Sequence, residues 1–226
     1  MKAYIVKVLK ADFVTHNVKR FRVEKPVWYT FIPGQATEIS INKTALEHEL
    51  RPFTFTSLPN AEHLEFIIKI YTGHHGMTEK LLDVEVGDEL IVHEVFGTIR
   101  YEGPGTFIAG GAGITPFIAI FRHLFFNELK KQNEMELNRL LFANRTEEDI
   151  ILRDELRGML GNNYHDVIEV SVSGGPGRRI DRDLLSHYIG DKKHYYYVCG
   201  PEKFTEVTVN NLINFGVPRP QIILEQ

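Results

Sequence analysis

The chain has 226 residues, of which 43% are hydrophobic and 25% charged, with a formal net charge of −4 at pH 7. This composition is typical of a globular protein of one large or two small domains, and the negative charge argues against nucleic acid as the main partner. The single cysteine, Cys199, excludes an internal disulfide and a four-cysteine iron–sulfur cluster within this sequence.

The first residues contain no apolar signal-peptide core, and no apolar run approaches the roughly 18 residues that a membrane span needs. We therefore expect a cytoplasmic protein without a membrane span.

The first hundred residues predict short strands separated by turn residues such as Pro33-Gly34 and Gly87-Asp88. Apolar and other residues alternate along His63–Tyr71, where Leu64, Phe66, Ile68 and Ile70 share one face. Further strands are expected at Thr37–Ile41, Phe53–Ser57 and Glu89–Val95, with one short helix at Thr78–Leu82. Many short antiparallel strands predict a small closed barrel.

Glu102-Gly103-Pro104-Gly105 is the best linker candidate, because strands and helices alternate after it. The predicted strands are Thr106–Gly110, Arg139–Ala143, Val167–Ser173, Tyr195–Cys199 and Gln221–Leu224. The predicted helices are Pro116–Lys130, Glu147–Leu160, Arg182–Ile189 and Glu202–Phe215. Such alternation predicts a parallel five-stranded sheet covered on both faces, and thus two domains, residues 1–103 and 104–226.

A glycine turn, Gly110-Gly111-Ala112-Gly113-Ile114-Thr115-Pro116, joins the first of these strands to its helix. Glycines let the backbone approach a pyrophosphate, and the helix start offers free N–H groups to it. Cys199-Gly200-Pro201 follows another strand of the same sheet. Because ligands sit beyond the carboxyl ends of parallel strands, both turns are expected to face one crevice. The alternative for Cys199 is a small buried apolar residue.

The segment Arg51-Pro52-Phe53-Thr54 suits a flat, phosphorylated ligand. Alternate residues of a strand share a face, so Arg51 can bind a phosphate while Phe53 stacks on a ring and Thr54 bonds its edge. The alternative is a strand with one surface arginine and a core aromatic residue.

The turn Gly76-Met77-Thr78 opens the short helix and offers a second anion site, with a plain helix cap by Thr78 as the alternative. The preceding His74 and His75 have no carboxylate or cysteine cluster near them in the sequence. We therefore expect exposed turn histidines and no metal site.

Together these segments resemble the ferredoxin–NADP reductase-like flavoenzymes over nearly the whole chain. Phe31-Ile32-Pro33-Gly34-Gln35 is similar to the turn before the family's flavin strand, and Arg51-Pro52-Phe53-Thr54 to its flavin motif. Gly76-Met77-Thr78 resembles its flavin phosphate turn. The glycine turn and Cys199-Gly200-Pro201 resemble its two nicotinamide-nucleotide motifs. The resemblance implies a six-stranded flavin-binding barrel followed by a nucleotide-binding domain.

The resemblance also implies residue roles. Arg51, Met77 and Thr78 would hold the flavin phosphate, with Phe53 on the isoalloxazine ring and Thr54 at its N5 edge. Thr54, Thr115 and Cys199 are the residues expected at the reacting centre. The complete set of expected cofactor-binding residues is Arg51, Pro52, Phe53, Thr54, Gly76, Met77, Thr78, Gly110, Gly111, Gly113, Thr115, Pro116, Arg145, Arg179, Cys199, Gly200 and Pro201.

The chain departs from the family pattern in two ways. Phe53 stands where tyrosine is commoner, so one hydroxyl contact is absent while stacking is retained. At Glu225-Gln226 the chain has neither the aromatic residue that covers the flavin in plant-type members nor the cysteine-rich ferredoxin tail of some relatives. Without the aromatic residue, nicotinamide is expected to reach the flavin with less competition. Any iron–sulfur partner must then be another protein.

The choice between NADPH and NADH depends on Leu141–Ile150, which follows the second strand of the nucleotide domain. Arg145, with Arg178 or Arg179 from the next loop, favours the 2′-phosphate of NADPH. Against this, the segment resembles that of NADH-dependent cytochrome reductases. Arg145 has the alternative of pairing with Glu148 or Asp149.

The expected function is an NAD(P)H-dependent reductase with FAD, feeding a flavodoxin, a ferredoxin or a similar acceptor. FAD is preferred to FMN by the resemblance alone. Two alternatives remain. One is a flavin-binding electron-transfer subunit of a larger complex, and the other is a nucleotide-binding module without turnover.

Overall fold

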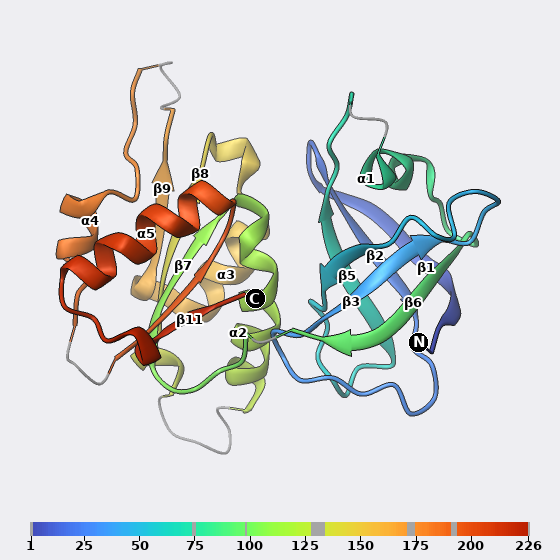
Figure 1. The fold of residues 1–226 in the computed structure, drawn as a ribbon, viewed down its shortest axis with the longest axis horizontal. Coiled ribbons are helices and arrows are strands. Elements are labelled where there is room, and N and C mark those ends of the chain that lie inside the picture. Colours follow the sequence, from blue (N-terminus) through green and yellow to red (C-terminus); the bar gives the residue numbers. More distant parts are fainter. Residues whose placement is uncertain are drawn as a thin grey trace.

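The computed structural model describes residues 2–73, 76–97, 99–127, 134–170, 175–190 and 194–225. A six-stranded antiparallel sheet and a five-stranded parallel sheet stand side by side (Figure 1), so the predicted fold class is confirmed. The turn histidines His74 and His75, the last part of the expected strand Val167–Ser173 and the end of the expected helix Pro116–Lys130 lie outside the described residues.

The antiparallel sheet comprises β1 (Tyr4–Thr15), β2 (Val18–Glu24), β3 (Ala36–Ile41), β4 (Arg51–Thr54), β5 (His63–Lys69) and β6 (Glu89–Phe96). The strands lie in the order β4-β3-β6-β1-β2-β5. Just beyond β4, the Thr56 N–H donates to the Glu65 carbonyl of β5 at 2.8 Å, which joins the two edges into a barrel. The short helix α1 (Met77–Lys80) and a 3-10 turn at Leu81–Asp83 precede β6.

Both faces of β5 are buried. The predicted apolar face is correct, with Leu64, Phe66 and Ile68 at most 2% exposed in the barrel core. On the opposite face, Glu65 is 1% exposed and Ile67 packs with residues of the parallel-sheet half. Alternation along one strand therefore predicted its inner face, and the second sheet with its helices covers the outer one.

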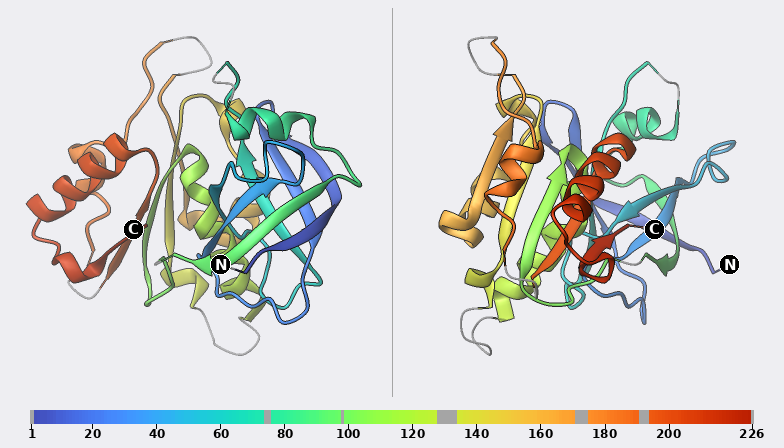
Figure 2. Two further views of the ribbon diagram at one scale, coloured as in Figure 1. Left: turned by 45° about the vertical axis from the view of Figure 1, so that its right-hand side comes forward. Right: turned by 60° about the vertical axis from the view of Figure 1, so that its left-hand side comes forward.

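The parallel sheet has the order β11-β10-β7-β8-β9. Its strands are β7 (Gly105–Gly110), β8 (Arg139–Asn144), β9 (Tyr164–Ile168), β10 (Tyr195–Cys199) and β11 (Ile222–Leu224). Its helices are α2 (Thr115–Asn127), α3 (Arg153–Leu160), α4 (Arg182–Ser186) and α5 (Glu202–Asn214). Helices α2 and α3 pack between this sheet and the barrel, and α4 and α5 cover the far face (Figure 2).

The expected continuous helix Glu147–Leu160 is wrong. Thr146 and Asp149 form a capping box around a 3-10 turn, and Leu152 adopts the left-handed conformation with φ 51°. A left-handed residue cannot continue a right-handed helix, so α3 starts only at Arg153.

The linker is held in place by the buried Tyr197 of β10. Its hydroxyl accepts hydrogen bonds from the backbone N–H groups of Glu102 and Gly103, at 2.9 and 3.1 Å, and donates to the Gly103 carbonyl at 2.7 Å. The segment Gly103-Pro104-Gly105 thus connects the two sheets, and the Tyr197 hydroxyl fixes the path of this connection.

Arg122 of α2 connects the two halves of the molecule. It donates to Glu65 Oε1 at 2.6 Å and to the Thr56 carbonyl at 2.7 Å. Glu65 also accepts from Arg22 and from the Thr56 hydroxyl, at 2.8 and 3.0 Å. Burial acts to raise the pKa of Glu65, but Arg122 and these other donors outweigh it and hold that pKa below its ordinary value.

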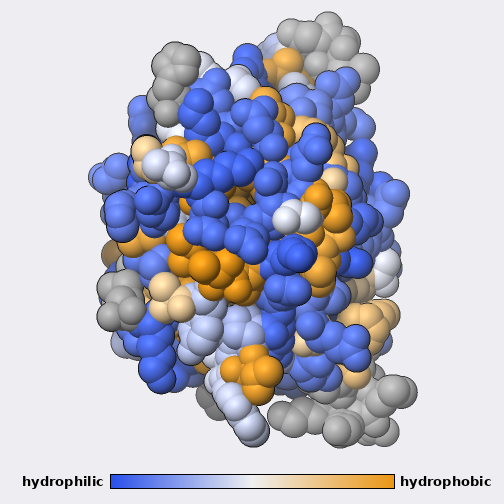
Figure 3. All heavy atoms as spheres, turned by 90° about the vertical axis from the view of Figure 1, so that its right-hand side faces the viewer, coloured by the Kyte–Doolittle hydropathy of each residue, from blue (hydrophilic) through white to orange (hydrophobic). Residues whose placement is uncertain are grey.

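The outer face of the barrel, turned away from the parallel sheet, exposes apolar side chains (Figure 3). A groove of 690 Å³ on the barrel is lined by Ile5, Leu9 and Val27, which are 60%, 49% and 77% exposed, together with charged residues such as Glu24 and Lys25. Among the residues described, no helix has the length and apolar character that crossing a bilayer requires.

Lys19 supplies a stability prediction. Its ammonium, on a residue only 6% exposed, donates to the carbonyls of Leu82 and Val84 at 2.8 and 2.7 Å, where the turn after α1 ends. Lys19→Met leaves these carbonyls without their donor, so urea unfolding should show a loss of about 1–3 kcal/mol. Lys10→Met, at a half-exposed ion pair, should stay within about 0.5 kcal/mol of wild type. Equal losses in the two variants would contradict this assignment.

Glu65 supplies a pH prediction. Because its folded pKa lies below the ordinary value of 4.5, its stabilisation is complete above pH 4.5 and is lost as the pH falls through the folded value. Glu65→Gln should cost about 3–5 kcal/mol at neutral pH, since Arg122 and Arg22 lose their buried counter-charge. The difference in unfolding free energy between the two proteins should narrow as the pH is lowered from 7 to 3. A difference in unfolding free energy that stays constant from pH 7 to pH 3 would contradict this prediction.

Candidate functional site

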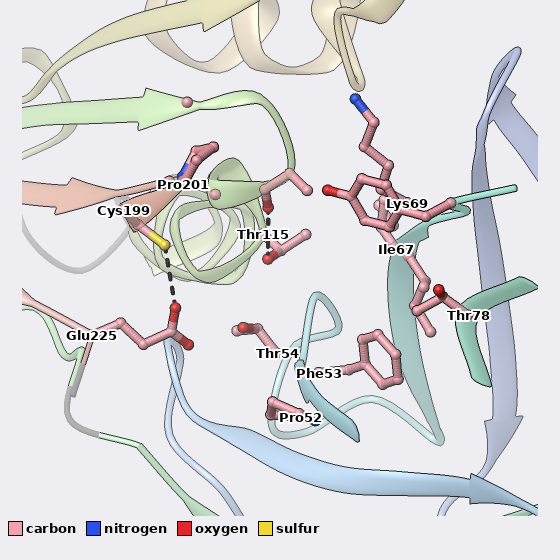
Figure 4. A pocket seen from close by; sticks show the side chains of 16 residues that line it. Pro52, Phe53, Thr54, Ile67, Lys69, Thr78, Thr115, Cys199, Pro201 and Glu225 are labelled. Atoms are coloured by element: carbon pink, nitrogen blue, oxygen red, sulfur yellow. Dashed lines mark hydrogen bonds between the residues drawn. The ribbon is translucent and has the colours of Figure 1, made fainter. Parts of the chain in front are cut away.

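A cleft of 420 Å³ lies between the barrel and the carboxyl ends of the parallel strands (Figure 4). Both halves of the molecule line it. The lining residues are Pro52, Phe53, Thr54, Ile67, Ile68, Lys69, Tyr71, Thr78, Gly110, Ala112, Gly113, Thr115, Cys199, Gly200, Pro201 and Glu225. Its size falls within the range of small-molecule sites, and its walls are mainly apolar with a few polar groups.

Strands β4 and β5 form the barrel wall. Phe53 is partly exposed and Thr54 is 7% exposed, so an aromatic ring and a hydroxyl sit side by side on this wall. Ile67 and Lys69 join them from the outer face of β5. Arg51 does not line the cleft; its guanidinium is exposed and donates to the Leu50 carbonyl at 2.7 Å.

The glycine turn faces this wall from the parallel sheet. At Gly111 φ is +52° and an added Cβ would meet nothing within 4 Å, so the backbone is open to a ligand. At Gly113 an added Cβ would lie 2.4 Å from the Cys199 carbonyl oxygen. Gly113 thus lets the turn pack on the end of β10, while Gly111 leaves its surface free. The Thr115 hydroxyl donates to the Ala112 carbonyl at 3.0 Å.

Cys199 lies at the end of β10 beside Glu225. Its thiol donates to Glu225 Oε2 at 3.3 Å, as drawn in Figure 4. Burial and then the Glu225 carboxylate raise the pKa of Cys199 far above its ordinary value. The thiol is therefore neutral at physiological pH and acts as a small polar wall group, with little nucleophilic character.

Of the described residues in the turn at α1, only Thr78 reaches the cleft. The side chain of Met77 is fully buried in the barrel core, which leaves only its backbone for a ligand. At Gly76 an added Cβ would meet nothing within 4 Å, so this backbone is open.

A smaller hollow of 210 Å³ adjoins the cleft and shares Lys69, Tyr71 and Gly110 with it. Arg145 and Glu169 also line it. No described residue forms an ion pair with Arg145, because the expected partner Asp149 accepts hydrogen bonds from the Thr146 N–H and hydroxyl instead. The alternative of an Arg145 pair with Glu148 or Asp149 is thus absent from the described part of the chain.

Two further side chains characterise this hollow. Asn144 lines it with a side chain whose amide nitrogen and oxygen are both buried and lack partners in the described structure. Most buried amides in folded proteins are hydrogen-bonded, so this one marks a place for a ligand or a water. Arg179 does not line the hollow, but pairs at 3.6 Å with Glu169, which does.

The structure brings most of the sequence-predicted residues together. In the cleft it places Pro52, Phe53, Thr54, Thr78, Gly110, Gly113, Thr115, Cys199, Gly200 and Pro201, and in the adjoining hollow Gly111 and Arg145. Outside both lie Arg51, Gly76, Met77, Pro116 and Arg179. Contact with a ligand stays a prediction for all of these residues, whether they line the two hollows or not.

Ile67, Lys69, Tyr71 and Glu225 line the cleft without having been expected there. The alternation along β5 places Glu65, Ile67 and Lys69 on one face, and this pattern could have identified Ile67 and Lys69 as residues of the cleft. Glu225 has no local pattern that would mark it, because the position of β11 beside β10 brings it to Cys199.

These walls suit a flat ring and a phosphorylated chain. Phe53 offers a stacking surface, Thr54 a hydroxyl, and Gly76 and Gly111 offer open backbone for phosphate groups. Thr115 and Cys199 lie across the cleft from Thr54, so a second ligand bound to the turns would meet the first one face to face (Figure 4).

Comparison with known proteins assigns a different domain family to each half of the molecule. Residues 3–106 match a family model described as an FAD-binding domain, and residues 107–210 match one described as an oxidoreductase NAD-binding domain. The barrel is therefore an FAD-binding domain and the parallel-sheet half an NAD-binding domain. NADH–cytochrome b5 reductase 1 of Arabidopsis thaliana is 31% identical, over 93% of this chain and 79% of that protein.

The reductase component of propane 2-monooxygenase from Rhodococcus jostii is 26% identical, over 97% of this chain. The chain spans only 62% of the length of that relative. Among solved structures, the cytochrome b5 reductase domain of Ulva prolifera nitrate reductase has a TM-score of 0.82, with 23% identity over 99% of this chain and 97% of that one. That likeness is one of fold. The fold is also that of a ferredoxin–NADP reductase, and the chain belongs to the oxidoreductases with an FAD-binding and an NAD-binding domain, the family of the NADH–cytochrome b5 reductases.

Proposed function

We propose that the protein is a flavin-dependent reductase that takes electrons from NAD(P)H and delivers them to a small redox protein. The observation that carries this proposal is the shared cleft, in which Phe53 and Thr54 of the FAD-binding domain face Thr115 and Cys199 of the NAD-binding domain. When bound, FAD supplies the chemistry, because it accepts a hydride from NAD(P)H and releases the two electrons to an acceptor.

The residues of the chain orient the two ligands. Phe53 stacks on the flavin ring, and Thr54 donates its hydroxyl to the reacting edge. The open backbone at Gly76 and the Thr78 hydroxyl bind flavin phosphate, with Arg51 turning toward it on binding. Gly111 and the N–H groups at the start of α2 bind the nucleotide pyrophosphate.

Cys199 and Thr115 form the wall against which the nicotinamide lies. A neutral thiol there fills space without introducing a charge beside the ring, and the closed wall excludes water from the reacting edges. Gly110, Gly113, Gly200 and Pro201 shape the two turns, with Pro116 just after the first of them, and Pro52 lies opposite on the barrel wall.

We further propose that residues 1–103 and 104–226 are the two domains. The two family models meet between residues 106 and 107, and β6 ends at Phe96 while β7 starts at Gly105. We also propose a flavodoxin or ferredoxin as acceptor and the cytoplasm as location. Relatives named as reductase components of oxygenase systems support a redox-protein acceptor.

A subunit of a larger complex is the second candidate function. The groove at Ile5, Leu9 and Val27 on the barrel favours it, because large exposed apolar side chains gathered in one place mark interaction sites.

The first test is an anaerobic titration of the FAD-loaded protein. We expect NADPH or NADH to bleach the visible flavin band, because the cleft brings nicotinamide to the flavin. A yellow protein that neither nucleotide bleaches would contradict the free-standing reductase and favour the subunit. A protein that never binds FAD would leave a nucleotide-binding module.

Arg145 supplies a second prediction. Its guanidinium forms no ion pair with any described residue and lies in the hollow beside the cleft, where it favours the 2′-phosphate of NADPH, so we propose NADPH as the preferred donor. Arg145→Gln should raise the KM for NADPH roughly tenfold to a hundredfold, the equivalent of one charge-assisted hydrogen bond, and leave the KM for NADH unchanged. Steady-state kinetics with both nucleotides measures this. Arg157→Gln, which removes a charge paired with Asp166, is the matched control. Equal KM changes for both nucleotides would remove the role assigned to Arg145.

A further inference from the structure

We propose that Arg122 is a positioning residue, which sets the approach of nicotinamide to flavin by locking the two walls of the cleft together. This inference rests on the proposed reductase function. None of the residues that Arg122 binds is among those that line the cleft. Its effect is therefore exerted through the elements that carry the lining residues.

Arg122 engages three elements at once. Its Nη1 donates to the Thr56 carbonyl and to Glu65 Oε1, at 2.7 and 2.6 Å, both in the barrel. Its Nε and Nη2 donate to the two carboxylate oxygens of Glu155 on α3, at 2.5 and 3.0 Å. The Arg122 side chain is only 13% exposed. One side chain thus holds both barrel edges and one helix of the NAD-binding domain.

Each group that Arg122 binds in the barrel lies within a few residues of a residue that lines the cleft. Thr56 follows Thr54 by two residues, and Glu65 precedes Ile67 by two residues on the same strand face. Arg122 itself stands about two helical turns beyond Thr115 on α2. Displacement of the guanidinium would therefore shift the Thr54 wall relative to the Thr115 wall.

The barrel side of this contact is independently fixed. Glu65 is also bound by Arg22 and Thr56, so its carboxylate stays in place when Arg122 is removed. Removal of Arg122 consequently loosens the polar contact between the NAD-binding domain and a barrel whose own geometry is retained.

The kinetic test uses FAD-loaded Arg122→Gln and Arg122→Lys. With saturating NAD(P)H, the rate of flavin reduction should fall roughly tenfold to a hundredfold in Arg122→Gln, because ångström-scale misplacement slows transfer to that extent. FAD binding and nucleotide Kd should remain near wild type. Arg122→Lys, which keeps the charge but fewer bonds, should recover part of the rate. Arg153→Gln breaks ion pairs to Asp166 and Glu147 inside one domain and should reduce flavin at the wild-type rate.

The second readout needs no cofactor. In a Cys199→Ser background, spin labels at Lys80→Cys and Arg178→Cys report the distance between the barrel and the NAD-binding domain. The distribution should broaden in Arg122→Gln and stay narrow in Arg153→Gln.

Narrow distance distributions and wild-type reduction rates in both Arg122 variants would overturn the proposal. A variant that loses only thermal stability or FAD content, with normal rates in its loaded fraction, would also overturn it in favour of a purely structural role. If Arg122→Gln does not fold, the reduction rates and distance distributions are measured in Arg122→Lys and Glu65→Gln instead. Failure of wild type to be reduced would instead reject the reductase function itself.

Discussion

Arg122 reaches from the helix that starts at the glycine turn into the barrel, where it pairs with the buried Glu65. Two opposed charges withdrawn from water are stable only when their hydrogen-bonding capacity is filled, and here Arg22, Thr56 and Glu155 complete it. The charge pair therefore tolerates one relative placement of the two sheets. The cleft between them inherits its shape from that placement.

Close contact between two turns defines the nucleotide side of the cleft. Gly113 approaches the Cys199 carbonyl so nearly that no side chain fits, and Gly200 meets Phe204 in the same way. This packing aligns the ends of β7 and β10, leaving Gly111 as the open surface of the turn. The glycines of this turn thus have two different roles. Gly113 lets the turn pack against the end of β10, and Gly111 leaves the backbone accessible to a ligand.

Sequence reasoning succeeded where the determinants are local. The glycine turn and the alternating strands and helices of the second half each follow from short patterns. The barrel strand expected at Phe53–Ser57 is displaced, because β4 covers Arg51–Thr54. Sequence reasoning missed what depends on tertiary contact. Glu65 has the pattern of a solvent-facing strand residue, and Arg122 that of an ordinary helix arginine. Their pairing spans 57 positions, which no local periodicity reveals. The break in the helix expected at Glu147–Leu160 likewise depends on Leu152 adopting a left-handed conformation.

The apolar core beneath α2 is shared between the two halves of the chain. Val18 and Ile67 of the barrel and Ile99 of the crossing segment belong to the same cluster as Phe117 and Phe121. Unfolding of either half would therefore remove part of the other half's core. The two halves should therefore melt in one cooperative transition, and a barrel expressed alone would present Val18 and Ile67 to water as an aggregation-prone surface.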